Sequence, residues 1–168
     1  MRIREATEAD AADAARLWTE GYTEQSPREG RRLPYDEGEL AVAAAAATVL
    51  VAESGAGEPV GIAALVPAGS NGGAVARPGE AELARLVVAA AARRRGVGRA
   101  LAVRCLELAR EQGAAQVVLW SRPYQVEAHF LYESLGFRRT PERDGRDPDG
   151  RRWVFSLTLA GCQPEVDK

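Results

Sequence analysis

Three arginines and two glycines open the segment Arg93–Leu101, which reads RRRGVGRAL. It follows the apolar stretch Glu82–Val88 (ELARLVV) and leads into an amphipathic stretch, so we expect a strand, a short connection, a glycine pair and a helix. Glycines let a ligand approach the backbone closely, and the free N–H groups of a first helical turn point toward an anion. Arginine side chains add charge-assisted hydrogen bonds. The segment therefore predicts a binding site for a phosphate-bearing ligand.

Other interpretations of this segment are weaker. A P-loop requires a Gly-Lys-Ser/Thr ending, and a dinucleotide-binding fingerprint requires a third glycine near Leu101; the segment has neither. A solvated basic face and a nucleic-acid site stay open on the segment alone. The net charge of the chain is −2, which gives no overall field that favours nucleic acid. We therefore expect no nucleic-acid partner.

The segment resembles the signature of the GCN5-related N-acetyltransferase (GNAT) superfamily, Arg/Gln-x-x-Gly-x-Gly/Ala. Arg93, Gly96 and Gly98 match that pattern. A second block, AHFLYESLGF at 128–137, resembles the family's helix that ends in Leu-Tyr-x-x-Leu-Gly-Phe, and the intervening strand 117–121 is in the right place. The resemblance implies a single-domain GNAT-like fold of the α/β (α+β) class and an acetyl-CoA-dependent N-acetyltransferase.

The resemblance also implies how acetyl-CoA is bound. Backbone N–H groups from Arg94 to Arg99 would hold its pyrophosphate, Leu86 to Val88 would expose main chain to the pantetheine arm, and the N–H of Val88 would polarise the acetyl carbonyl. Gln125 stands where many relatives have a cofactor-contacting asparagine. The implied cofactor-binding residues are Leu86, Val87, Val88, Arg93, Arg94, Arg95, Gly96, Val97, Gly98, Arg99 and Gln125. No metal is expected.

Two catalytic residues follow from the resemblance. Tyr132 occupies the position of the family tyrosine that protonates the departing thiolate, although packing of a half-buried tyrosine against the sheet is the alternative. Glu82 lies eleven residues before Arg93, where histone-acetylating members carry a general base. Glu80 and a water relay stay open as alternatives to Glu82. We expect packing or solvent exposure, and no chemical role, for the sole histidine, His129.

The elements that must position these residues alternate between strand and helix patterns. They predict a mixed, mostly antiparallel sheet of about seven strands flanked by about four helices. The predicted strands are 2–5, 48–53, 59–66, 82–88, 116–121, 137–140 and 153–159, and the predicted helices are 9–20, 39–47, 96–112 and 125–135. Residues 21–38 are expected to form a polar loop, and the glycine-rich stretch 68–79 a flexible connection.

Composition and length favour one domain, residues 1–160, followed by a tail at 161–168. The charged N-terminus lacks the apolar core of a signal peptide, and the longest apolar run, 40–52, is too short to span a bilayer. Cys105 and Cys162 show no metal-ligand spacing, and Cys105 is expected in a helix core. We therefore expect a cytoplasmic protein without a membrane partner.

The acceptor has a predicted site of its own. The resemblance places it between the first two helices and the last hairpin, where Trp18, Tyr22 and Tyr35 could hold a cationic amine together with nearby acids. Arginines in the first loop equally permit an acidic substrate; they are Arg28, Arg31 and Arg32. The predicted partner is a small-molecule or amino-acid-like amine. A protein N-terminus or lysine is the alternative acceptor, a noncatalytic acyl-CoA-binding module is the alternative function, and a homodimer is compatible with the family.

Overall fold

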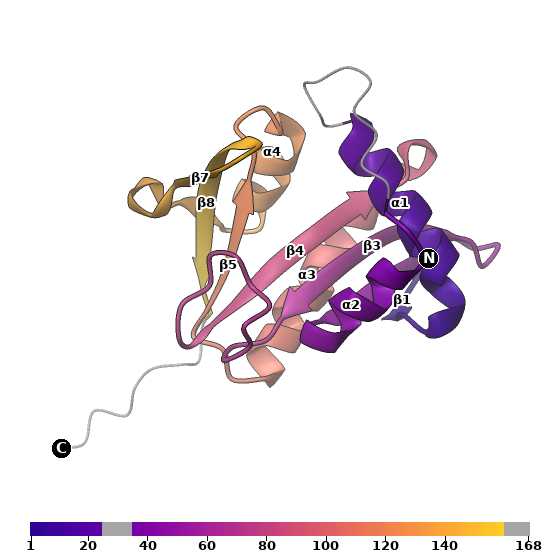
Figure 1. Ribbon diagram of the computed structural model, residues 1–168, viewed down its shortest axis with the longest axis horizontal. Helices are drawn as coiled ribbons and strands as arrows, with labels where there is room; N and C mark the ends of the chain where they lie inside the picture. The colour runs from indigo at the N-terminus through magenta and orange to yellow at the C-terminus, as the bar shows by residue number, and fades with distance from the viewer. Residues whose placement is uncertain (25–34, 160–168) are drawn as a thin grey trace.

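The computed structural model describes residues 1–24 and 35–159 (Figure 1). The strands are β1 (Arg2–Glu5), β2 (Thr48–Glu53), β3 (Pro59–Val66), β4 (Glu80–Val88), β5 (Gln116–Ser121), β6 (Arg138–Arg139), β7 (Gly145–Asp147) and β8 (Gly150–Thr158). The α-helices in this part of the chain are α1 (Ala11–Glu24), α2 (Gly38–Ala46), α3 (Val97–Glu111) and α4 (Val126–Ser134). The tail 161–168 and four residues discussed above lie outside the described ranges; these residues are Arg28, Arg31, Arg32 and Cys162.

The strands form one mixed sheet in the order β1-β2-β3-β4-β5-β8-β6, with β7 added to β8. Neighbouring strands are antiparallel except for β4 and β5, which are parallel. Figure 1 shows α1 and α2 over one face of the sheet and α3 behind β3 and β4 on the other. The predicted mostly antiparallel α/β fold is therefore confirmed, with one more strand than expected because Gly145–Asp147 also pairs with β8.

Side chains alternate between two cores, as expected for strands covered on both faces. Leu50 and Leu65 face α3, whereas Val51 and Ile62 face α1 and α2. Cys105 is fully buried in the α3 core, as predicted.

The first helix is longer than the sequence predicted. A loop was expected from Gly21, but α1 continues to Glu24. Gly21 sits in the helix against β4, where an added Cβ would lie 2.4 Å from Val87 Cγ1. Close packing of α1 on the sheet therefore requires glycine here and outweighs its weak helix propensity.

A bulge in β4 changes which face its residues present. Before the bulge, Leu83 faces the α3 core and Ala84 the α1 core. After it, Leu86 and Val88 face α3, so the alternation has shifted by one residue. The shift occurs at Arg85, which has a φ of 54°, and the pairing register between β3 and β4 shifts nearby. An extra residue of this kind bends a strand and re-aims its side chains.

Candidate active site

Strands β4 and β5 are paired along only part of their length. The parallel pairing joins Glu80–Glu82 to Gln116–Val118, although β4 continues to Val88 and β5 to Ser121. The other edge of β5 is held by β8 along its whole length. Figure 1 shows β4 and β5 diverging toward the end of the sheet where α4 lies. Main-chain N–H and C=O groups of β4 beyond Glu82 therefore face a gap in the sheet that an extended ligand could enter.

The start of α3 presents free backbone N–H groups. Gly96 is its N-cap, with φ 80° and ψ 9°, and the N–H of Ala100 donates to the carbonyl of Gly96. The N–H groups of Val97, Gly98 and Arg99 come before that bond, so they have no acceptor within the helix. Such an N-terminus attracts anions through these donors and through the helix dipole.

One pocket of about 820 Å³ joins these two features. The predicted residues in its wall are Leu86, Val87, Val88, Arg93, Arg94, Gly96, Val97, Gly98, Arg99, Gln125 and Tyr132. Glu24, Tyr124 and Phe130 also line it and were not predicted. Arg95 lines a different cavity, beside the β2–β3 turn, because the chain turns between Arg94 and the helix start.

The arginines of the motif have different partners. Arg93 donates through Nε to the carbonyl of Val88 at 3.1 Å and through Nη2 to the Glu24 carboxylate at 2.6 Å. It therefore ties α1 to the end of β4. Arg99 donates to Ser134 Oγ at 2.9 Å, whereas the side chain of Arg94 is 89% exposed at the rim.

Tyr132 is a buried residue of the pocket wall. Its ring packs against Phe137 and Phe155, with centroid separations of 6.0 and 5.9 Å. Burial raises the pKa of its phenol to about 12, because the charged form is poorly solvated there. Tyr132 therefore stays protonated at neutral pH, which is the state that a proton donor requires.

Gln125 and His129 organise the connection between β5 and α4. Gln125 Oε1 accepts hydrogen bonds from Ser121 Oγ at 2.8 Å and from the N–H of Arg122 at 2.7 Å. His129 Nε2 lies 3.1 Å from both Ser121 Oγ and the carbonyl of Arg122. Burial lowers the pKa of His129, and its ring stacks on Trp153. The expectation that His129 has a packing role agrees with this environment.

A family model described as the acetyltransferase (GNAT) family matches residues 11–137. The chain belongs to the GNAT family. Among curated relatives, N-acetyltransferase family 8 member 3 of Rattus norvegicus is 38% identical over 92 residues, which cover 55% of this chain and 39% of the relative. N-acetylaspartate synthetase of Danio rerio is 41% identical over 63 residues, which cover 38% of this chain and 22% of the relative. The chain thus spans less than half the length of these relatives.

Solved structures share the GNAT fold. The ribosomal-protein-alanine N-acetyltransferase from Brucella melitensis is 23% identical with a TM-score of 0.74, covering 95% of this chain and all of the other. A phosphinothricin acetyltransferase from Sinorhizobium meliloti in complex with AcCoA is 18% identical with a TM-score of 0.75, covering 94% of this chain and 88% of the other. Residues 11–137 thus match the acetyltransferase (GNAT) family model, and the first relative named above is an N-acetyltransferase.

In this GNAT chain Glu82 lies away from the pocket wall. Its side chain is 2% exposed, and its carboxylate accepts hydrogen bonds from the backbone N–H groups of Ala74 (2.8 Å), Val75 (2.6 Å) and Ala76 (2.9 Å). The glycine-rich stretch 68–79, which was expected to be a flexible connection, is therefore held to β4 by these hydrogen bonds. Glu80, the alternative base, is bound by Arg143 through two hydrogen bonds of 2.9 and 2.8 Å.

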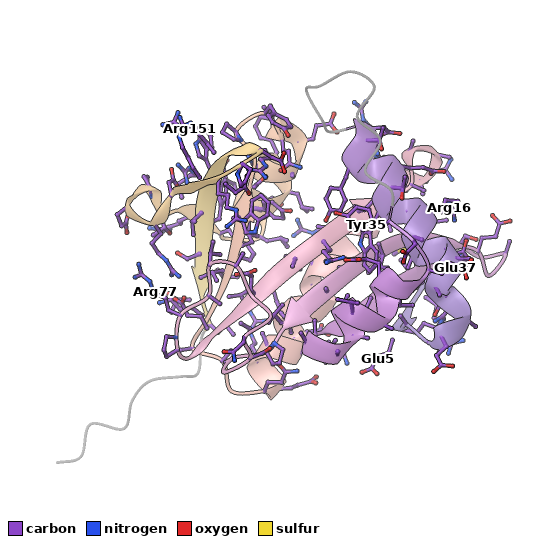
Figure 2. The ribbon with its side chains drawn as sticks, in the orientation of Figure 1. Glu5, Arg16, Tyr35, Glu37, Arg77 and Arg151 are labelled. Carbon is purple, nitrogen blue, oxygen red and sulfur yellow. The ribbon has the colours of Figure 1, made fainter. Side chains whose placement is uncertain are left out.

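The residues predicted to hold the acceptor lie together on the α1 face. The Tyr35 ring is 6.2 Å from that of Trp18 and 5.6 Å from that of Tyr22, and Figure 2 shows Tyr35 beside α1. Burial raises the pKa of both tyrosines, so both stay neutral at physiological pH. Arg85 belongs to this group and was not predicted, because its side chain reaches it only through the bulge in β4.

Two further findings concern the described ranges alone. Within residues 1–24 and 35–159, no three histidine, cysteine, aspartate or glutamate side chains gather as metal ligands. No helix in that same part of the chain is long and apolar enough to cross a membrane.

Proposed function

We propose that this GNAT chain transfers the acetyl group of acetyl-CoA to a primary amine of a small-molecule or amino-acid-like acceptor by direct attack. The observation that carries the proposal is the continuous pocket. It runs from the unpaired edge of β4 to the free N–H groups of α3, and Tyr132 stands in its wall. This arrangement suits a long thioester carrier with an anionic end.

The cosubstrate is held mainly by main chain. The N–H groups of Val97, Gly98 and Arg99 bind the pyrophosphate, and nearby guanidinium groups add positive charge. The pantetheine arm lies along the open edge at Leu86, Val87 and Val88, where the N–H of Val88 polarises the acetyl carbonyl. Further contacts come from Arg93, Arg94, Gly96 and Gln125.

The transfer step needs two proton movements. The neutral amine nitrogen forms a bond to the carbonyl carbon, and the carbon–sulfur bond then breaks with its electron pair going to sulfur. Tyr132 gives its phenolic proton to the departing thiolate, and the nitrogen loses its extra proton to a base. General acid catalysis of this kind contributes about 10²–10⁴ in rate.

Two routes are available for removing the amine proton, direct transfer to Glu82 or a water relay. The relay fits the environment of Glu82 better, because both carboxylate oxygens accept backbone hydrogen bonds. The free energy of deprotonation at pH 7 is about 4.6 kcal/mol for a lysine-like amine and about 1.4 kcal/mol for an α-amino group. A weak base therefore favours acceptors with an α-amino group.

The acceptor lies beside the half-buried Tyr22 and Tyr35, and Trp18, which is fully buried, supports this site by packing against Tyr35. The named relatives include an N-acetylaspartate synthetase, and the named structures include enzymes for ribosomal-protein alanine and for phosphinothricin. The N-acetylaspartate and phosphinothricin names support an amino-acid-like acceptor, whereas the ribosomal-protein-alanine name fits the alternative of a protein N-terminus.

A coenzyme A thiol-release assay tests the proposal directly. The panel contains free amino acids, simple amines, polyamines, and peptides with a free N-terminus or lysine. We expect acetyl-CoA-dependent release with at least one small amine. Release of coenzyme A thiol with peptides alone would indicate that the chain acetylates proteins and not small molecules. Binding of acetyl-CoA without release for any amine would support a noncatalytic module and refute the proposal.

A further inference from the structure

Arg85 occupies an unusual backbone position next to the pocket. Its φ of 54° lies in the left-handed region, which a residue other than glycine rarely adopts. Trp18 Nε1 donates a hydrogen bond to its carbonyl oxygen at 3.3 Å and so helps to hold the bulge. Strained residues and bulges of this kind persist where a side chain must be aimed at a particular place.

The guanidinium of Arg85 is aimed at the α1 face and held there. Its central carbon lies 5.0 Å from the Trp18 ring centroid and 5.8 Å from that of Tyr35. Nη2 forms an ion pair with Glu39 Oε1 at 2.7 Å. Nη1 is shielded from solvent and has no hydrogen-bond partner in the described part of the chain. One edge of this cation is thus paired, and the other is not.

An unpaired guanidinium edge points to a ligand with oxygen acceptors. A buried N–H group without an acceptor destabilises the folded state. The planar guanidinium group of arginine presents paired N–H donors whose spacing matches the two oxygens of a carboxylate. Arg85 is followed directly by Leu86, Val87 and Val88, which line the pocket. Two residues of strand span about 7 Å, so a small molecule at that part of β4 lies close to Arg85, and its oxygen atoms reach Nη1 when the side chains that shield this atom move aside.

We propose that the acceptor amine also carries a carboxylate, and that the Nη1 edge of Arg85 binds this carboxylate from the α1 face of the sheet. The inference rests on the proposed N-acetyltransferase function and specifies its acceptor class. Glu39 competes for the same cation, so its negative charge weakens the interaction with the acceptor carboxylate.

Matched acceptor pairs test this inference. L-alanine, L-phenylalanine, L-methionine and L-aspartate are each compared with the compound in which every carboxylate is a carboxamide. We expect kcat/KM, corrected for the fraction of neutral amine, to favour the acid by about 10- to 100-fold. Arg85→Gln should abolish this preference, and Glu39→Gln should increase it. Arg110→Gln, an exposed change at the end of α3, should leave it intact.

Equal kcat/KM for acids and carboxamides, or a preference that survives in folded Arg85→Gln, would overturn the inference. If Arg85→Gln does not fold, the preference in wild type and its increase in Glu39→Gln decide the question. Calorimetric titration of the same pairs into the coenzyme A-bound protein gives a second readout. Tighter binding of the acid than of its carboxamide supports the carboxylate site at Arg85, even if no amine releases thiol. Equal binding of the two compounds overturns the inference. Absence of thiol release with every amine counts against the proposed function instead.

Discussion

Replacing Gly96 by alanine isolates the backbone geometry at the start of α3. Gly96 has a φ of 80°, and an added Cβ would meet no atom within 4 Å, so the substitution introduces strain without a clash. A left-handed alanine costs about 1–2 kcal/mol, and the lost flexibility of the unfolded chain offsets about 0.4–1 kcal/mol of this. The net loss of about 1 kcal/mol lowers Tm by about 2–4 °C for a chain of this size.

The same substitution should weaken acetyl-CoA binding. Relief of the strain turns the N–H groups of Val97 and Gly98 away from their present direction. Loss of one hydrogen bond to a charged phosphate costs about 1.5–3 kcal/mol, which weakens binding about 10- to 100-fold. Isothermal titration with acetyl-CoA and thermal unfolding measure the two effects separately.

Gly113→Ala is the matched control. Gly113 has a φ of 77°, an added Cβ there also meets no atom within 4 Å, and it follows the opposite end of α3. It should lower Tm by a similar amount and leave acetyl-CoA affinity unchanged. Equal affinities in the two variants, measured on folded protein, would refute the assignment of the anion site to the start of α3.

Three further predictions concern side chains. Tyr132→Phe should lower kcat by at least about 10² with little change in acetyl-CoA affinity; an equal loss of both would indicate a packing role. Glu82→Gln should lower stability by about 1–3 kcal/mol, because the new NH₂ group faces backbone donors, while the pH profile of kcat/KM keeps its shape; a loss of that profile's acidic limb at unchanged Tm would identify Glu82 as the base. A hydrogen bond from Arg122 is the main reason why the pKa of Asp147 is lowered from 3.8 to about 2. Its folded pKa lies below the unfolded value, so its contribution, about 1 kcal/mol when solvent screening is included, is present above pH 4 and is lost as pH falls through 2. Urea unfolding should therefore show Asp147→Asn clearly destabilised at pH 6 and much less so at pH 2; equal destabilisation at both would contradict this linkage.

The parts of the site carried by local motifs were predictable from the sequence. Gly96 was expected at the start of a helix, where a glycine lets a ligand approach the backbone, and the structure places it there as a left-handed N-cap. Gly136 likewise ends α4 with a φ of 98°. In both places one residue type and its immediate neighbours determine the geometry.

The parts that depend on contacts across the fold were not predictable. Glu82 accepts hydrogen bonds from a stretch whose glycines suggested only flexibility, and nothing in that stretch marks its N–H groups as donors to a carboxylate. The bulge at Arg85 has no sequence signal either, because arginine is not a residue typical of a left-handed position. Simple alternation along β4 would have placed Leu86 and Val88 on the wrong face.

A crystal structure of the chain with bound coenzyme A tests the central claim most directly. We expect diphosphate oxygens within hydrogen-bond distance of the N–H groups of Val97, Gly98 or Arg99, with the thiol end beside β4 between Leu86 and Val88. Coenzyme A bound instead in the cavity beside the β2–β3 turn, or a start of α3 that contacts no phosphate, would contradict it.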